Sequence, residues 1–235
     1  MEPAIAIMQP YFFPYIGYFQ LINAVNKFVF YDDVNFIKRG WINRNKILIN
    51  NQSNYFTIPC KDVSQNKLIN QIGHALNDRS REKLLKKVSL SYRNAPFFNS
   101  VFPIIEKVVR FKSNLISDLA IESVETTCNY LKLHTSFEIS SKKYNNRDLD
   151  RADRLIDICN IEGIKHYINP ESGKTLYEKS YFSKRGITLS FLKTGDVRYK
   201  QFQNDFIQRL SIIDVMMFNS PEEIRANLLP DFKLI

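Results

Sequence analysis

The first 33 residues contain the succession of elements that most restricts the fold. The segment "PAIAIM" (residues 3–8) is an apolar run of strand length, and the loop "QPYFFP" follows it. "YIGYFQLINAV" (15–25) then places apolar residues at helical spacing, with Pro14 suited to the first turn of that helix. "KFVFYDD" (27–33) is a second strand, and it ends in two acids. This succession predicts an α/β sheet, whose ligands bind beyond the carboxyl ends of the strands.

The rest of the chain continues this pattern around a helical middle. Helical periodicity dominates residues 67–133, strands are indicated at "SFEISSKKY" and "GITLSFLK", and a helix at "LDRADRLIDICNIEGI". A last long helix is expected over "QFQNDFIQRLSIIDVMMFN" (201–219). No Ser/Gly/Pro-rich linker divides the 235 residues. We therefore expect one Rossmann-like α/β domain over residues 1–235, with a mostly parallel sheet and a helical insertion at about 67–133.

The stretch "YIGY" after the first strand concerns ligand binding. Nucleotidylyltransferase domains carry an H-x-G-H element here, in which the Gly lets a nucleotide approach the backbone and the His pair contacts phosphates. In this chain Tyr15, Gly17 and Tyr18 occupy the corresponding places. Tyrosine can donate a hydrogen bond or stack on a base, but it is not a cation at neutral pH. The match supports a nucleotidylyltransferase-like strand, loop and helix, and it does not support the same chemistry.

The aromatic loop and helix that follow the first strand are expected to have two sides. Four apolar side chains should pack the helix onto the sheet: Phe12, Phe13, Ile16 and Phe19. The tyrosines of the same stretch have polar tips, which can reach the ligand edge of the sheet.

Polar, basic and aromatic side chains gather around that edge. Asp32 and Asp33 can orient an amine, accept a proton or hold a metal, while the basic and aromatic residues that follow can contact a phosphate and a base. Taken singly, each is also compatible with a turn or a solvated surface. Together they predict a binding cleft with these substrate-binding residues: Gln9, Tyr11, Tyr15, Gly17, Tyr18, Asn35, Lys38, Trp41, Arg44, Asn45, Lys46 and Ser141.

The candidate catalytic residues are Asp33, Asp32 and His74, each as a general base. His74 lies among polar neighbours in "INQIGHALNDRS", although a lone histidine is more often structural. The three histidines share no metal-ligand spacing, and the chain contains no Walker loop and no G-x-G-x-x-G fingerprint. We therefore expect no metal site and no cofactor.

Charge and cysteine usage indicate the partners and the compartment. The balance of 33 basic and 24 acidic residues gives +9, which favours an anionic partner, although a basic surface without a special partner is equally compatible. The three cysteines are far apart, as in reduced cytosolic proteins. No apolar run has transmembrane length, and the N-terminus has no basic leader. The sequence therefore predicts a cytoplasmic protein without membrane insertion.

Four segments resemble the WbqC-like protein family, which belongs to bacterial gene clusters for O-antigen and other surface polysaccharides. They are "MQPYFFPYIGYFQLI", "FVFYDDVNFIKRGWINRNKI", "YRNAPFF" and "SIIDVMMFN", spread from Met8 to Asn219. The resemblance implies transfer of glycine or a similar acyl group onto an amino sugar. Such sugars are carried as dTDP- or UDP-linked nucleotides, which are anionic and have a base that can stack.

Three functions remain open at this point. The first is an aminoacyl- or acyltransferase acting on a nucleotide-linked amino sugar, with an aminoacyl carrier protein, an aminoacyl-tRNA or an adenylate as donor. The second is a non-catalytic nucleotide-sugar-binding or scaffold protein of glycan assembly. The third is a tRNA- or RNA-binding module that depends on the basic charge. The sequence does not fix the sugar, the donor or the oligomeric state.

Overall fold

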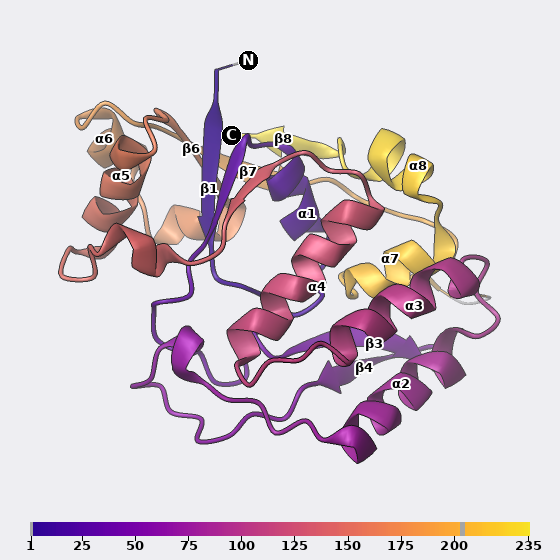
Figure 1. Cartoon of the computed structure of the whole chain (residues 1–235). Coiled ribbons are helices and arrows are strands. Elements are labelled where there is room, and N and C mark those ends of the chain that lie inside the picture. Colours follow the sequence, from indigo (N-terminus) through magenta and orange to yellow (C-terminus); the bar gives the residue numbers. More distant parts are fainter. Residues whose placement is uncertain (1, 203–204) are drawn as a thin grey trace.

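The computed structural model describes residues 2–202 and 205–235, and it contains a six-stranded sheet in the order β5-β2-β1-β6-β7-β8 (Figure 1). Counted along the chain, the third strand of this sheet lies at one edge, followed by the second, first, fourth, fifth and sixth, which is the Rossmann order. All neighbouring strands are parallel except β7 and β8. The predicted Rossmann-like, mostly parallel sheet is confirmed. The strands are β1 (Ala4–Met8), β2 (Lys27–Phe30), β5 (Ser136–Glu138), β6 (His166–Pro170), β7 (Thr188–Thr194) and β8 (Phe232–Leu234).

Helices cover both faces of the sheet because its strands alternate between two hydrophobic clusters. Ala4, Ala6 and Phe28 pack in one cluster with α1 (Ile16–Asn23) and α4 (Ile116–Tyr130). On the other face, Ile5, Ile7 and Val29 pack with α5 (Arg151–Ile161) and α6 (Lys179–Ser183). Strands buried on both faces are typical of parallel sheets in α/β proteins.

The helical insertion lies between β2 and β5 and begins with a hairpin. It contains β3 (Arg44–Ile49), β4 (Gln52–Thr57), η1 (Ile69–Gln71), α2 (Asp78–Tyr92) and α3 (Phe98–Val109), and it ends with α4. Asn50 and Asn51 form the hairpin turn with φ of +48° and +59°, the signs that a type I′ turn requires. Figure 1 shows the hairpin, α2 and α3 beyond the end of the sheet where β1 finishes.

The C-terminal part differs from the helix predicted over 201–219. In the described residues only α7 (Ile212–Phe218) is helical there, and Gln203 and Asn204 of the predicted helix lie outside those residues. Ser211 ends the irregular segment: its backbone N–H donates to the Lys46 carbonyl at 2.8 Å, and its side chain accepts from the Ile213 N–H. These bonds begin the helix at Ile212 instead of earlier. The remaining short elements are η2 (Ser141–Tyr144), η3 (Glu171–Thr175), α8 (Pro221–Glu223) and η4 (Ile224–Leu228).

Within the described part of the chain, no helix combines the length and the apolar character needed to cross a membrane. The three cysteines are unpaired, and burial raises the pKa of Cys60 and of Cys159 to about 12, so both thiols are protonated at neutral pH.

Candidate functional site

The carboxyl ends of β1, β2 and β5 lie side by side and bring distant polar residues together. Gln9 follows β1, Asp32 and Asp33 follow β2, and Ser140 and Ser141 follow β5. The chain leaves β1 toward α1 on one face, and it leaves β6, the neighbour of β1, toward α6 on the other. Such a reversal between adjacent strands is where open α/β sheets take their ligands.

Asp32 is a buried carboxylate held by neutral donors. Its side chain is 4% exposed, and its Oδ1 accepts hydrogen bonds from Ser140 Oγ at 2.7 Å and from the Ser141 N–H at 3.1 Å. No cation pairs with it among the residues described. Burial raises the pKa of Asp32, and the hydrogen bonds from Ser140 and Ser141 only partly oppose this. A carboxyl group with a raised pKa is better matched to accepting a proton near neutral pH.

The Asp33 carboxylate forms a buried ion pair with Arg154. One guanidinium nitrogen, Nη2, lies 2.5 Å from Oδ1 and 2.6 Å from Oδ2, and Ser141 Oγ donates to the same carboxylate. The Arg154 Nε donates to Asn146 Oδ1 at 2.8 Å, and its guanidinium lies 4.5 Å from the centre of the Tyr31 ring. The pair therefore ties β2 to α5. This geometry favours an orienting role for Asp33 over a catalytic one.

Arg154 was not predicted from the sequence. The feature of the sequence that could have revealed it is a basic residue on the apolar side of a helix. Arg154 lies four residues before Ile158 and next to Leu155, and both of these are buried. A cation in that position needs a buried partner.

Gln9 contributes an unsatisfied acceptor at the end of β1. Its Oε1 is buried and has no hydrogen-bond partner in the described structure, whereas its backbone carbonyl accepts from the Tyr18 hydroxyl at 2.9 Å. The Tyr11 and Tyr18 rings are 5.7 Å apart, and burial raises the pKa of both hydroxyls. Because buried acceptors are almost always paired, Gln9 Oε1 indicates a place for a water molecule or a ligand donor.

The aromatic loop after β1 is fixed from several sides. Phe12 and Phe13 are fully buried, as predicted, and Phe13 has a φ of +40°. The Phe13 N–H donates to Ser123 Oγ at 2.9 Å, and its carbonyl accepts from Asn45 Nδ2 at 2.9 Å and from Ser211 Oγ at 2.7 Å. Asn45, a predicted substrate-binding residue, thus holds this loop in place.

The N-terminus of α1, where Rossmann folds bind phosphate, is covered by protein in this chain. The Ile212 N–H donates to the Pro14 carbonyl at 2.9 Å, and Tyr15 forms an isolated β-bridge with Ser211. A side chain at Gly17 would overlap the Tyr15 ring and the Thr194 hydroxyl. Here Gly17 serves the packing of α1, and Tyr15 stays half-buried beside it.

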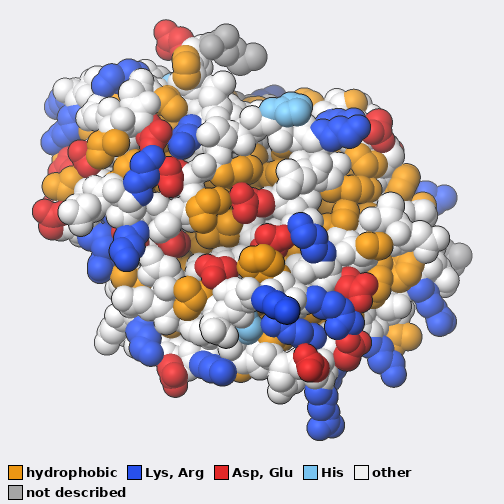
Figure 2. Space-filling model, viewed as in Figure 1, with side chains coloured by type: hydrophobic (Ala, Val, Ile, Leu, Met, Phe, Trp, Pro, Cys, Tyr) orange, Lys and Arg blue, Asp and Glu red, His pale blue; other side chains and the backbone are white. Residues whose placement is uncertain are grey.

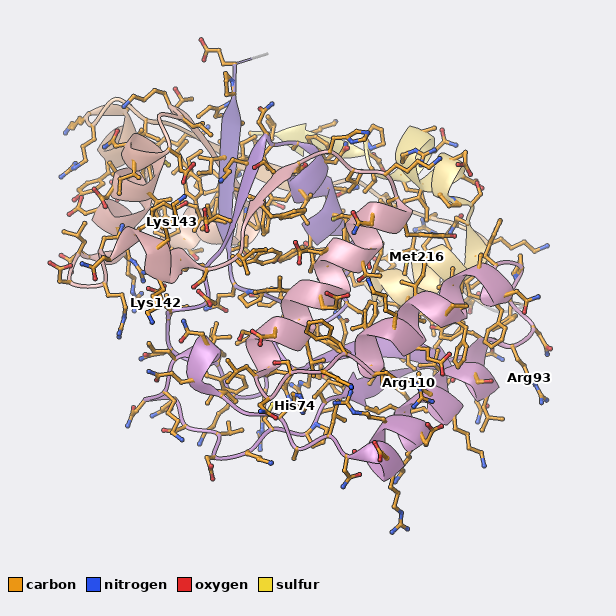
Figure 3. All side chains as sticks on the ribbon, viewed as in Figure 1. His74, Arg93, Arg110, Lys142, Lys143 and Met216 are labelled. Carbon is orange, nitrogen blue, oxygen red and sulfur yellow. The ribbon has the colours of Figure 1, made fainter. Side chains whose placement is uncertain are left out.

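His74 lies outside this cluster. Its Nε2 contacts the Ser113 carbonyl at 2.6 Å, and its Nδ1 accepts from the Leu76 N–H at 3.2 Å, so both ring nitrogens have backbone partners. Burial lowers the pKa of His74 and favours the neutral ring. Figure 3 places His74 apart from Lys142, the residue that follows Ser141. Its predicted catalytic role therefore has no free nitrogen to support it.

The basic and aromatic candidates form a second group on the hairpin. The Arg44 guanidinium lies 4.3 Å from the centre of the Tyr55 ring, and Lys46 Nζ lies 5.6 Å from it. The Trp41 ring is 6.5 Å from the Tyr55 ring. Asn35 and Lys38 are exposed on the loop before the hairpin. The predicted substrate-binding residues thus divide between the carboxyl edge of the sheet and the hairpin.

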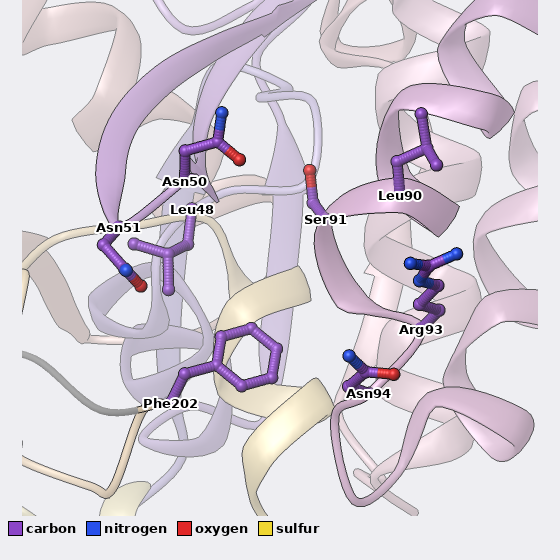
Figure 4. Close-up of a pocket in the computed structure, with 8 residues that line it drawn as sticks. All are labelled: Leu48, Asn50, Asn51, Leu90, Ser91, Arg93, Asn94 and Phe202. Atoms are coloured by element: carbon purple, nitrogen blue, oxygen red, sulfur yellow. The ribbon is translucent and has the colours of Figure 1, made fainter.

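A hollow of about 390 Å³ opens where the hairpin turn meets the end of α2 (Figure 4). No predicted site residue lines it. Its lining residues are Leu48, Asn50, Asn51, Leu90, Ser91, Arg93, Asn94 and Phe202.

A buried acid, Asp214 in α7, ties the walls around this hollow together. It accepts from the Tyr92 hydroxyl at 2.8 Å, the Tyr199 hydroxyl at 2.7 Å and Gln201 Nε2 at 2.8 Å. Burial raises the pKa of Asp214. Its three neutral donors and full burial identify it as a structural junction of the fold. In the described chain, His, Cys, Asp and Glu form no group of three or more suited to a metal ion.

Comparisons with known proteins agree with this arrangement over nearly the whole chain. The chain is 25% identical over 231 residues to the protein named "Uncharacterized protein Rv1507c" of Mycobacterium tuberculosis, covering 92% of this chain and 93% of that protein. No solved structure matches it significantly. Residues 9–226 match the sequence model of the WbqC-like protein family, and this match includes the aromatic loop, Asp32, the hairpin and α7. The chain belongs to the WbqC-like protein family.

Proposed function

We propose that the chain transfers glycine or another aminoacyl or acyl group onto the amine of a dTDP- or UDP-linked amino sugar, in the biosynthesis of O-antigen or another surface polysaccharide. Membership of the WbqC-like family supports the pathway. The observation that carries the reaction is Asp32: a buried carboxylate with a raised pKa and neutral donors, at the ligand edge of a Rossmann-like sheet.

The chemistry requires a neutral amine, because an ammonium group has no lone pair for attack on an acyl carbon. Asp32 is the base that accepts the ammonium proton, and Ser140 and Ser141 fix its orientation. Gln9 Oε1, which lacks a partner in the described structure, accepts a hydrogen bond from the amine or a sugar hydroxyl. The Asp33–Arg154 pair fixes the end of β2 against α5 beside this position.

The test combines binding with transfer. Wild-type protein and Asp32→Asn are mixed with UDP- or dTDP-amino sugars, and melting temperatures and calorimetric affinities are measured. Transfer is then assayed with aminoacyl carrier protein, aminoacyl-tRNA and aminoacyl adenylate donors. Asp32→Asn should bind the sugar nucleotide but lose about 10²–10⁴-fold in transfer rate, the usual contribution of a general base. Asp148→Asn, an exposed acid in the loop before α5, is the matched control and should behave as wild type.

Two results would contradict the proposal. One is that no nucleotide-linked amino sugar raises the melting temperature of the wild type. The other is that Asp32→Asn transfers the acyl group at the wild-type rate.

A second function, nucleotide-sugar binding without catalysis, is favoured by one observation. Asp33 is paired with Arg154, and both ring nitrogens of His74 have backbone partners. Of the three candidate bases, this leaves Asp32 to accept a proton. Calorimetric binding of a sugar nucleotide with no product from any of the three donors would support this function over transfer.

A further inference from the structure

The hairpin β3–β4 carries an uncompensated positive charge. Residues 34–61 contain no Asp or Glu, while they include Lys38, Arg39, Arg44, Lys46 and Lys61. The structure adds Lys87 from α2, whose Nζ donates to the Tyr55 carbonyl at 2.6 Å. None of these six cations forms a salt bridge in the parts of the chain that the structure describes. Figure 2 shows further Lys and Arg side chains projecting at the lower right of the molecule, where Figure 1 places α2.

Exposed aromatic rings lie within this positive charge. Asn45 and Phe56 face the buried side of the hairpin, which puts Lys46 and its ladder partner Tyr55 on the outer side. Tyr55 is 44% exposed and Trp41 is 40% exposed. Large aromatic side chains are usually buried, and exposed ones flanked by cations are typical of platforms on which the bases of a single-stranded nucleic acid stack.

The outer face continues into the hollow. Arg44 and Lys46 are partly exposed on this face, whereas Leu48, the next residue on the same side of β3, is only 4% exposed and forms part of the wall of the hollow with Ser91 and Arg93. Its volume of about 390 Å³ lies within the range of small-ligand pockets. The hollow lies at the hairpin turn, at the other end of β3 from Trp41, so a chain of nucleotides lying along the face can place there a nucleotide remote from its acylated end.

The outer face of the hairpin with Trp41, Lys46 and Tyr55, called the platform below, also adjoins the carboxyl edge of the sheet. The Trp41 carbonyl accepts from the Phe12 N–H at 3.0 Å, and Phe12 lies three residues after Gln9. A ligand on the hairpin is thus next to the loop that leaves the proposed acceptor site.

We propose that the outer face of β3–β4, with α2 beside it, binds the single-stranded 3′ end of an RNA, as presented by an aminoacyl-tRNA donor. The cations contact phosphates, and Trp41 and Tyr55 stack on bases. An acidic carrier protein would also match the charge, but it would not account for two exposed rings surrounded by cations.

The donor role rests on the proposed function, whereas RNA binding does not. In the transfer, the ester bond between the acyl carbon and the terminal ribose oxygen breaks and an amide bond to the sugar nitrogen forms. Asp32 holds the proton taken from the ammonium group, and the second proton, which the nitrogen loses as the amide forms, passes to the released ribose oxygen.

The test uses the full chain and a fluorescein-labelled single-stranded RNA that ends in CCA, with a duplex RNA of equal length for comparison. Anisotropy titrations should show tighter binding of the single strand, with affinity that falls as salt rises. Trp41→Ala or Tyr55→Ala should weaken binding roughly 5- to 150-fold, the range for stacking on one ring. Lys46→Ala should weaken binding to every sequence and reduce the salt slope by about one.

Two variants on the opposite side of the fold serve as matched controls. Lys184→Ala removes an exposed cation after α6, and Leu176→Ala removes a side chain whose residue is 61% exposed. Both should bind RNA as wild type does. Melting temperatures of all variants show whether they are folded, and a platform variant that melts early is replaced by Lys46→Gln.

The inference is overturned if the single strand shows no salt-sensitive binding at low salt, if duplex binds equally well, or if the platform variants bind as wild type. It is also overturned as a donor site if transfer occurs from a carrier protein but never from aminoacyl-tRNA, which leaves the proposed function intact. RNA binding without any effect of nucleotide-linked amino sugars on melting would instead refute the proposed function and retain the RNA site.

Discussion

The buried Asp33–Arg154 pair gives the sharpest test of how the residues at the sheet edge divide between structure and chemistry. Its side chains are 2% and 5% exposed. Asp33→Asn leaves the guanidinium buried without a counter-charge, and breaking a buried pair in this way costs about 3–5 kcal/mol. In a chain of this size each kcal/mol lowers the melting temperature by ~2–4 °C, so the expected fall is roughly 6–20 °C.

Urea unfolding followed by far-UV circular dichroism measures this loss. The double variant Asp33→Asn/Arg154→Met should recover part of it, because the stranded charge is removed as well. Asp196→Asn, which breaks an exposed pair with Arg198, is the control and should change the unfolding free energy by less than about 1 kcal/mol. If Asp33→Asn unfolds at the wild-type midpoint but no longer binds ligand, Asp33 faces the ligand and the pairing argument is wrong.

Three further predictions concern neighbouring positions. Phe12→Ala removes a fully buried ring stacked on Phe56 and should cost about 3–5 kcal/mol in urea unfolding; a loss below about 1 kcal/mol would contradict the packing. Gly17→Ala should lose about 1–3 kcal/mol, since its methyl group overlaps Thr194, and an unchanged midpoint would show that α1 shifts freely. Burial raises the pKa of Asp32 above 3.8, so the folded state holds that proton more tightly and the carboxyl group destabilises the fold as pH rises through the raised pKa. The unfolding free energy of Asp32→Asn minus that of wild type should therefore be larger at about pH 7 than at about pH 4. The same difference at both pH values would contradict the raised pKa.

Much of the sheet follows from local sequence patterns. The apolar run before Gln9 and the acids after Phe30 place β1, β2 and their carboxyl ends where the structure has them. The predicted helix over 201–219 was wrong in its first half, although its apolar spacing is helical. Arg209 has a φ of +58°, and Ser211 bonds to the Lys46 carbonyl in β3. Tertiary hydrogen bonds override the local preference there, and periodicity does not report them.

The site is predictable only in part, for the same reason. Asp32 was recognised because carboxyl ends of parallel strands meet at one edge. The partner that occupies Asp33 lies 121 residues further along the chain, and Asn45 reaches a carbonyl 32 residues before it. Residue type and spacing identify which side chains can react. The long-range contacts decide which of those side chains still have a hydrogen-bonding atom free for a ligand.

A crystal structure with a bound UDP- or dTDP-linked amino sugar tests the assignment of the acceptor site most directly. The proposal predicts the sugar nitrogen about 3 Å from an Asp32 oxygen, with Gln9 Oε1 accepting a hydrogen bond from the ligand. A sugar nucleotide seated in the hollow beside Leu48 and Arg93, with Asp32 untouched, would contradict it.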